Sequence, residues 1–125
     1  MRIKNVKIGI RGLREGLEEF AKVAEAIERG ESPKKKRHGV YFENIDTMRK
    51  VLTDKRLTLL KAIKEKHPSS IYELAKIVDR DFKNVSDDLK YLAEIGLVEL
   101  KKSKEDRTRV TPAVGYDKIL LEIAV

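Results

Sequence analysis

The helix-start and helix-end signals in residues 57–100 constrain the fold more than any other feature of this chain. Apolar residues recur there at helical spacing in three short segments, and residues that begin or end helices separate them. Ser70 followed by Glu73 predicts a capping box, in which the hydroxyl and the carboxylate each bind a free backbone amide at a helix start. Asp81 is placed to cap the next helix after a tight turn at residues 79–80. We therefore expect a short helix, a turn of about three residues and a second helix.

The second helix, expected over residues 81–95, separates an apolar stripe from a polar face. Spacings of three, four and three predict one buried stripe, made of Phe82, Val85, Leu89 and Leu92. The residues expected to face outward are Lys83, Asn84, Ser86, Asp87 and Lys90. An exposed polar helix after such a turn is the arrangement that reads the DNA major groove, where Asn84 would bond adenine and Lys83 guanine. The alternative is that this face is only the solvated side of an amphipathic helix.

A basic β-hairpin is expected after this helix. Gly96 ends the helix, Leu97 begins a strand, and residues 107–111 return after a polar turn. The basic residues of this hairpin are Lys101, Lys102, Lys104, Arg107 and Arg109. Such side chains hold phosphates or enter the adjacent minor groove, or they protect an open strand edge. Further contacts to the DNA backbone are expected from Ser69, Ser70 and Arg80.

The charge of the chain favours a polyanionic partner, because the net charge is +7. Residues 81–109 nevertheless hold seven basic and seven acidic side chains, so the excess positive charge lies away from the expected reading helix. We expect Asp87 to be solvated and Asp88 to pair with a nearby basic side chain of the same protein. The basic run at residues 34–37 is an exposed linker, or an arm that follows phosphates.

The N-terminal part predicts a strand over residues 2–10 and a helix over residues 13–29. One stripe of this helix is apolar, and its residues are Leu13, Leu17, Phe20, Ala24 and Ile27. The stripe either covers the sheet of its own domain or packs on a second copy of the chain. We favour dimerisation through this helix, the C-terminal strand or both, since reading a palindromic site requires two copies.

The remaining elements complete the expected domain. A short strand is expected at residues 39–43, and two helices begin at Asn44 and Thr53. The second of these helices is expected to bury Leu57, Leu60 and Ile63 and to end before Pro68. The apolar tail at residues 116–125 predicts a strand that pairs with residues 2–10 or crosses to a partner.

With these elements in order, the chain resembles winged-helix transcriptional regulators of the MarR/ArsR type over residues 53–111. The motif that carries the resemblance is LAKIVDRDFKNVSDDLKYLAEIGLVE. The whole chain is similar to a subgroup of small prokaryotic predicted regulators, through the segments GVYFE, LTDKRL, DFKNV and GYDKI. Some members of that subgroup resemble antitoxins encoded beside a small toxin, so the resemblance allows a protein partner as well as DNA. Related regulators often carry Arg or His after the Ser of the reading helix, where this chain has Asp87 and Asp88.

The composition argues against several other classes of protein. Absence of cysteine excludes disulfides and thiolate zinc sites, and the two histidines, His38 and His67, have no third ligand at metal spacing. No catalytic arrangement or phosphate loop is present in the sequence, so we expect no enzyme, no metal and no cofactor. Without a membrane-length apolar run or a secretory signal, we expect a cytoplasmic protein. Charged residues make up 39% and Gln is absent, as in proteins from hot environments.

Together these patterns predict an α+β protein with a winged helix-turn-helix, an added N-terminal strand-helix segment and a C-terminal strand. Residues 1–38 form the N-terminal segment and linker, and residues 39–125 form the DNA-binding domain. The expected function is a sequence-specific regulator of transcription, a homodimeric repressor bound to double-stranded DNA. The rival is an interaction module that binds a partner protein, such as a cognate toxin. An RNA-binding role is disfavoured because aromatic side chains suited to stacking on bases are scarce on the polar faces.

Overall fold

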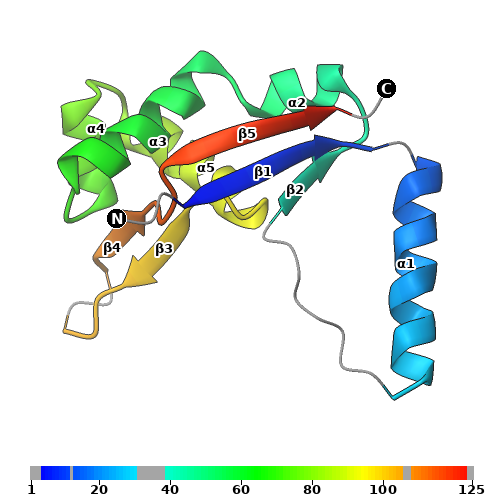
Figure 1. Ribbon diagram of the computed structural model, residues 1–125. Helices are drawn as coiled ribbons and strands as arrows, with labels where there is room; N and C mark the ends of the chain where they lie inside the picture. The colour runs from blue at the N-terminus through cyan, green and yellow to red at the C-terminus, as the bar shows by residue number, and fades with distance from the viewer. Residues whose placement is uncertain (1–3, 12, 31–38, 106–107, 124–125) are drawn as a thin grey trace.

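A computed structural model of the chain describes residues 4–11, 13–30, 39–105 and 108–123. Within these ranges the protein is α+β, with five helices and two sheets (Figure 1). The elements are β1 (Asn5–Ile10), α1 (Leu13–Glu28), β2 (Gly39–Phe42), α2 (Ile45–Val51), α3 (Asp54–Lys66), α4 (Ile71–Ile77), α5 (Phe82–Glu94), β3 (Glu99–Lys102), β4 (Val110–Ala113) and β5 (Lys118–Ile123). None of these helices is long and apolar enough to cross a bilayer. The basic run at residues 34–37 and His38 lie outside the described residues.

The helix starts follow the capping residues of the sequence. Oδ1 of Asn44 accepts the amide of Thr47 at 2.8 Å, and Oγ1 of Thr53 accepts the amide of Arg56 at 3.2 Å. Each cap satisfies a backbone donor that has no partner inside its helix. The predicted starts of α2 and α3 are therefore confirmed.

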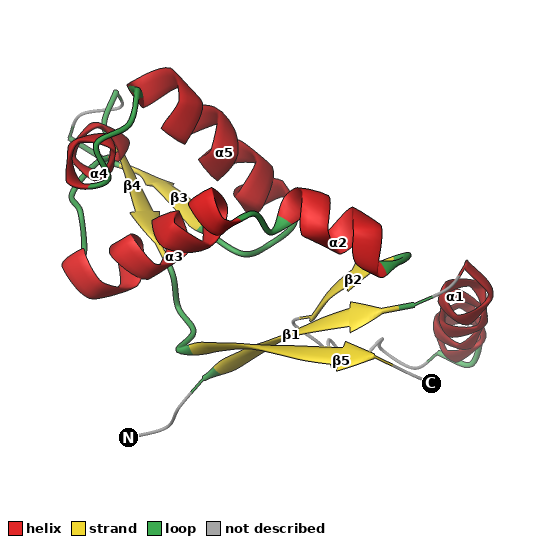
Figure 2. Ribbon diagram, turned by 90° about the horizontal axis from the view of Figure 1, so that it is seen from above, coloured by secondary structure: helices red, strands yellow, loops and turns green. Residues whose placement is uncertain are grey.

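The predicted strands at the two ends of the chain pair with each other. β1 lies between β2 and β5 in a three-stranded sheet, and both pairings are parallel (Figure 2). Val6 is opposite Ile119 in this sheet. β1 from the N-terminal segment thus shares one sheet with β5 from the other end of the chain. This confirms the alternative in which the tail pairs with residues 2–10.

An ion pair ties this sheet to the helices. The carboxylate of Asp117 accepts a hydrogen bond from the backbone amide of Lys4 at 2.9 Å. It also forms an ion pair with Lys64 of α3 at 3.0 Å. The hydrogen bond from the Lys4 amide, followed by the bond to Lys64, lowers the pKa of Asp117 below its usual value. The start of β5 is thereby held beside β1 and α3.

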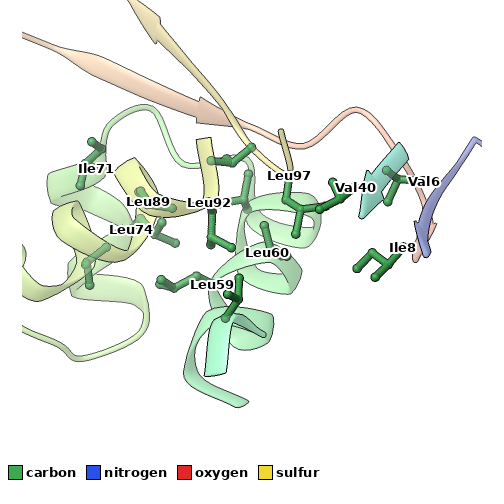
Figure 3. Close-up of a cluster of buried hydrophobic side chains, with 14 of the residues drawn as sticks. Val6, Ile8, Val40, Leu59, Leu60, Ile71, Leu74, Leu89, Leu92 and Leu97 are labelled. Atoms are coloured by element: carbon green, nitrogen blue, oxygen red, sulfur yellow. The ribbon is translucent and has the colours of Figure 1, made fainter. Parts of the chain in front are cut away.

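The core joins the helices to one face of the sheet (Figure 3). Leu59, Leu89 and Leu92 are completely buried, and the same cluster reaches Val6 and Ile8 of β1. Burial of such side chains away from water supplies most of the stabilisation of a domain this size. The helices and the three-stranded sheet therefore form one hydrophobic unit.

Two residues predicted to be buried are exposed. Leu57 is 40% exposed, because the inward face of α3 is made by Leu59, Leu60 and Ile63, and Leu57 points to one side of it. Phe82 is 48% exposed, because it is the first residue of α5 and packs against the ring of Tyr72, which is itself 60% exposed. Both predictions of burial were wrong.

α1 stands apart from the helical core in both views (Figures 1 and 2). Leu17, Phe20 and Ile27 are 59%, 72% and 55% exposed, and Ala24 is half-buried. The side chain of Leu13 lies outside the part of the structure that is described. The apolar stripe of α1 does not cover the sheet of its own chain.

Candidate nucleic-acid interface

The turn between α4 and α5 fixes the direction of the second helix. Asp79 has a positive φ of 54°, a conformation that Asp and Asn adopt more readily than most residues. The amide of Arg80 bonds the carbonyl of Ala75 at 3.0 Å, which closes the end of α4. Oδ2 of Asp81 then accepts the amides of Lys83 and Asn84 at 3.1 and 3.3 Å. The predicted helix, tight turn and capped second helix are present.

The start of α4 differs in one detail from the predicted capping box. Oγ of Ser70 accepts the amide of Glu73 at 3.0 Å, as expected. The Glu73 carboxylate instead bonds Ser69, accepting its hydroxyl at 2.5 Å and its amide at 3.3 Å. These bonds to Ser69 lower the pKa of Glu73. Ser69 and Ser70 therefore both act in capping α4, and the Ser69 carbonyl also accepts the hydroxyl of Thr111 at 2.7 Å.

The two faces of α5 are clearly separated. The inward side chains of Val85, Leu89 and Leu92 are completely buried. The predicted outward residues Lys83, Asn84, Asp87 and Lys90 are exposed, and Ser86 is half-buried. Neither Lys83 nor Lys90 forms an ion pair with another described residue. Their charges are therefore available to an external anion.

Asp88 points away from this outer face and binds two arginines. Its carboxylate accepts Nε of Arg56 at 3.2 Å and Nη2 of Arg80 at 2.8 Å. The three side chains are only 18–21% exposed. The prediction that Asp88 pairs within the chain is confirmed, and one negative charge is thereby removed from the outer surface of α5.

Arg56 extends this cluster to α2. Its Nη1 donates to the carbonyls of Lys50 and Val51 at 3.1 and 2.8 Å, and its guanidinium lies 4.7 Å from the centre of the Tyr91 ring. Four separate groups thus hold this one side chain. Sequence reasoning missed Arg56, although it shares the inward face of α3 with Leu60 and Ile63 at helical spacing.

The pairing with Asp88 also defines the environment of Arg80. The sequence suggested Arg80 as a contact to the DNA backbone, but its side chain is 79% buried and bonded to Asp88. Nη1 of Arg80 is buried and has no hydrogen-bond partner among the described residues. In this conformation the guanidinium faces the protein.

The predicted hairpin forms beside α5. β3 and β4 pair antiparallel, with Lys102 opposite Val110, and the amide of Ser103 bonds the carbonyl of Arg109 at 3.0 Å. Lys102 lines a cleft between the hairpin and α5, together with Lys90. Lys101 lies on the opposite face of β3, with its Nζ 3.8 Å from Glu99. The side chains of Lys104 and Arg109 are exposed, and Arg107 lies outside the described residues.

The described residues hold no group of three or more His, Cys, Asp or Glu side chains placed to bind a metal ion. His67 ends α3 with a positive φ of 47°, and it is exposed. Its backbone amide bonds the carbonyl of Ile63 at 3.1 Å, so the residue serves as a helix end.

Comparison with known proteins identifies a family and a distant structural similarity. No curated protein matches the chain. Among solved structures, the YusO protein from Bacillus subtilis aligns with 14% sequence identity and a TM-score of 0.49, over 83% of this chain and 68% of that protein. A family model described as HVO_A0114 matches residues 51–121, more than half of the 125 residues, and the chain therefore belongs to the HVO_A0114 family.

Proposed function

We propose that this protein is a winged helix-turn-helix regulator of transcription that binds double-stranded DNA. The observation that carries the proposal is the outer face of α5, where Lys83, Asn84 and Lys90 are exposed on the second helix of a helix-turn-helix. A 13-residue helix is about 20 Å long and fits the major groove, with the residues of its first turn nearest the base edges. In this arrangement Asn84 reads adenine and Lys83 reads guanine.

The charge distribution supports this assignment. Asp88 is held by Arg56 and Arg80, so Asp87 is the one carboxylate in the middle of the outer face. The hairpin β3–β4 is the wing, and its Lys102 lines the same cleft as Lys90. Binding of DNA phosphates to these cations releases counterions and makes the affinity depend steeply on salt.

We further propose that the protein acts as a homodimer and represses by occupying a promoter. The stripe of Leu17, Phe20, Ala24 and Ile27 on α1 would supply the contact between two copies. Two reading helices related by a twofold axis match the two halves of a palindromic site. The same exposed stripe favours the second candidate function, which is binding of a different protein such as a cognate toxin.

The test of DNA binding is selection from a pool of random duplexes, followed by fluorescence anisotropy on the enriched sequence and on its scrambled version. We expect preferential binding to the enriched sequence. Substituting Lys83 or Asn84 by Ala should weaken that binding by about 1–3 kcal/mol and weaken binding to the scrambled duplex much less. Equal losses on both duplexes would show that α5 does not read sequence.

A further inference from the structure

An aromatic pair is exposed at the entrance to α5. Tyr72 of α4 is 60% exposed and Phe82 of α5 is 48% exposed. Their ring centroids are 6.3 Å apart and the rings are tilted by 51°, so the two side chains contact each other across the turn. Exposed apolar surface is unfavourable in water, and contiguous apolar patches rimmed by polar residues mark binding surfaces. We call Tyr72 and Phe82 the aromatic pair.

The aromatic pair forms one wall of the cleft between α5 and the wing. This cleft has a volume of about 440 Å³. Its other lining residues include Ser86 and Lys90 of α5 and Lys102 and Val110 of the wing. The occupant that fits must therefore offer both anionic and apolar groups, because two lysines and several apolar side chains line the same space.

A DNA strand has both kinds of group. Its phosphates match Lys90 and Lys102, whereas the C5-methyl of thymine is the apolar group that projects into the major groove. Phe82 is the first residue of α5, and the N-terminal residues of a reading helix are those that reach base edges. Apolar contact with the thymine methyl is an established way for side chains to distinguish thymine from other bases.

We propose that Phe82, supported by Tyr72, contacts a thymine C5-methyl group and is a determinant of sequence specificity. This inference rests on the proposed DNA-binding function and adds an apolar contact to the polar contacts of Lys83 and Asn84. Tyr72 is a positioning residue, which holds the Phe82 ring at the turn. The cations of the cleft hold the backbone of the same strand.

The experiment uses the duplex obtained by selection, in which each thymine is replaced in turn by deoxyuridine. This change removes one methyl group and leaves every hydrogen-bonding group in place. At one thymine per half-site, we expect the wild-type protein to bind about fourfold more weakly, which is the effect of losing the burial of one methyl-sized group. Phe82→Ala should bind the thymine duplex more weakly and show no further loss with deoxyuridine.

Two variants serve as controls. Phe82→Leu keeps an apolar side chain and should retain part of the discrimination between thymine and deoxyuridine. Ile77→Ala removes a 40% exposed apolar side chain of α4 that does not line the cleft, and it should keep the full discrimination. Urea unfolding of each variant establishes that it is folded.

The outcomes separate this inference from the proposed function. Sequence-specific binding that is insensitive to deoxyuridine at every thymine would overturn the inference alone. So would a loss with deoxyuridine that is equal in the wild type and in Phe82→Ala, because another group would then contact the methyl. A selection that enriches no sequence would overturn both, and the aromatic pair would then be better explained as a contact for a protein.

Discussion

Replacing Asp88 by Asn should destabilise the protein more than any other single charge change on α5. The carboxylate of Asp88 accepts charge-assisted hydrogen bonds from Arg56 and Arg80 at 3.2 and 2.8 Å. An amide side chain keeps one acceptor oxygen and loses the negative charge. The two guanidinium groups would then lie close together in a largely buried site without a counter-ion.

The magnitude follows from the burial of these groups. Removing one partner of a fully buried ion pair costs about 3–5 kcal/mol, and hydrogen bonds to charged groups contribute about 1.5–3 kcal/mol each. The side chains here are 18–21% exposed, so water screens part of the penalty. We expect the free energy of unfolding to fall by about 2–3 kcal/mol.

Urea unfolding followed by circular dichroism measures this change. With a slope of roughly 2 kcal/mol per molar urea, in the middle of the usual range, the midpoint should fall by about 1–1.5 M. The matched control is Asp87→Asn, which makes the same chemical change at the neighbouring, exposed position. That variant should stay within about 0.5 kcal/mol of the wild type.

A double-mutant cycle with Arg56→Gln tests the cause. If the loss comes from the ion pair, the two substitutions should couple by about 1–2 kcal/mol. Equal midpoints for Asp88→Asn and Asp87→Asn would refute the argument, because burial would then not distinguish the two carboxylates. If Asp88→Asn lowers the stability but does not couple with Arg56→Gln, the loss comes from the contact with Arg80 or from helix packing.

Three further changes have defined expectations. The Tyr116 hydroxyl donates to the Leu97 carbonyl at 2.8 Å, so Tyr116→Phe should lower the free energy of unfolding by about 1 kcal/mol at neutral pH. Burial raises the pKa of Tyr116 from 10.0 to about 12. The stabilisation that Tyr116 contributes to the folded state is therefore complete below pH 10 and lost towards pH 12. Above pH 10, the urea midpoint of the wild type should fall more steeply than that of Tyr116→Phe. Lys102→Ala should reduce the slope of log DNA affinity against log salt concentration by about one unit. Lys101→Ala, on the opposite face of the strand, should leave this slope unchanged. Phe20→Glu should convert the proposed dimer into a monomer in light scattering, and a monomeric wild-type protein would contradict the proposed role of α1.

The local signals of the sequence were sufficient to predict most of the elements. Asn44, Thr53, Ser70 and Asp81 each cap the helix that was expected to follow them. Capping depends on side chains within three residues, so it can be read from sequence without the tertiary structure. The positive φ of Gly96 at the end of α5 belongs to the same class of local signal.

Features that depend on distant contacts were harder to predict. Apolar spacing placed Leu57 and Phe82 in buried stripes, but spacing does not show where the neighbouring layer ends. The parallel pairing of β1 with β5 joins residues more than a hundred positions apart, and the sequence left a crossing to a second copy open as an alternative. Arg56 was missed because a charged residue on an inward helix face gives no apolar signal.

Asp87 and Asp88 show why the surface charge of α5 cannot be counted from the sequence alone. Successive residues of a helix point about 100° apart, so two adjacent carboxylates face different surroundings. Asp88 lies next to the buried positions Val85 and Leu89 and is drawn towards Arg56, while Asp87 lies on the solvent side. The sum of seven basic and seven acidic residues over 81–109 therefore overstates the negative charge of the outer face. Arg56 of α3, 32 positions before Asp88 in the sequence, pairs with that carboxylate. It thereby neutralises one of the two acidic residues that distinguish this helix from the regulators it resembles.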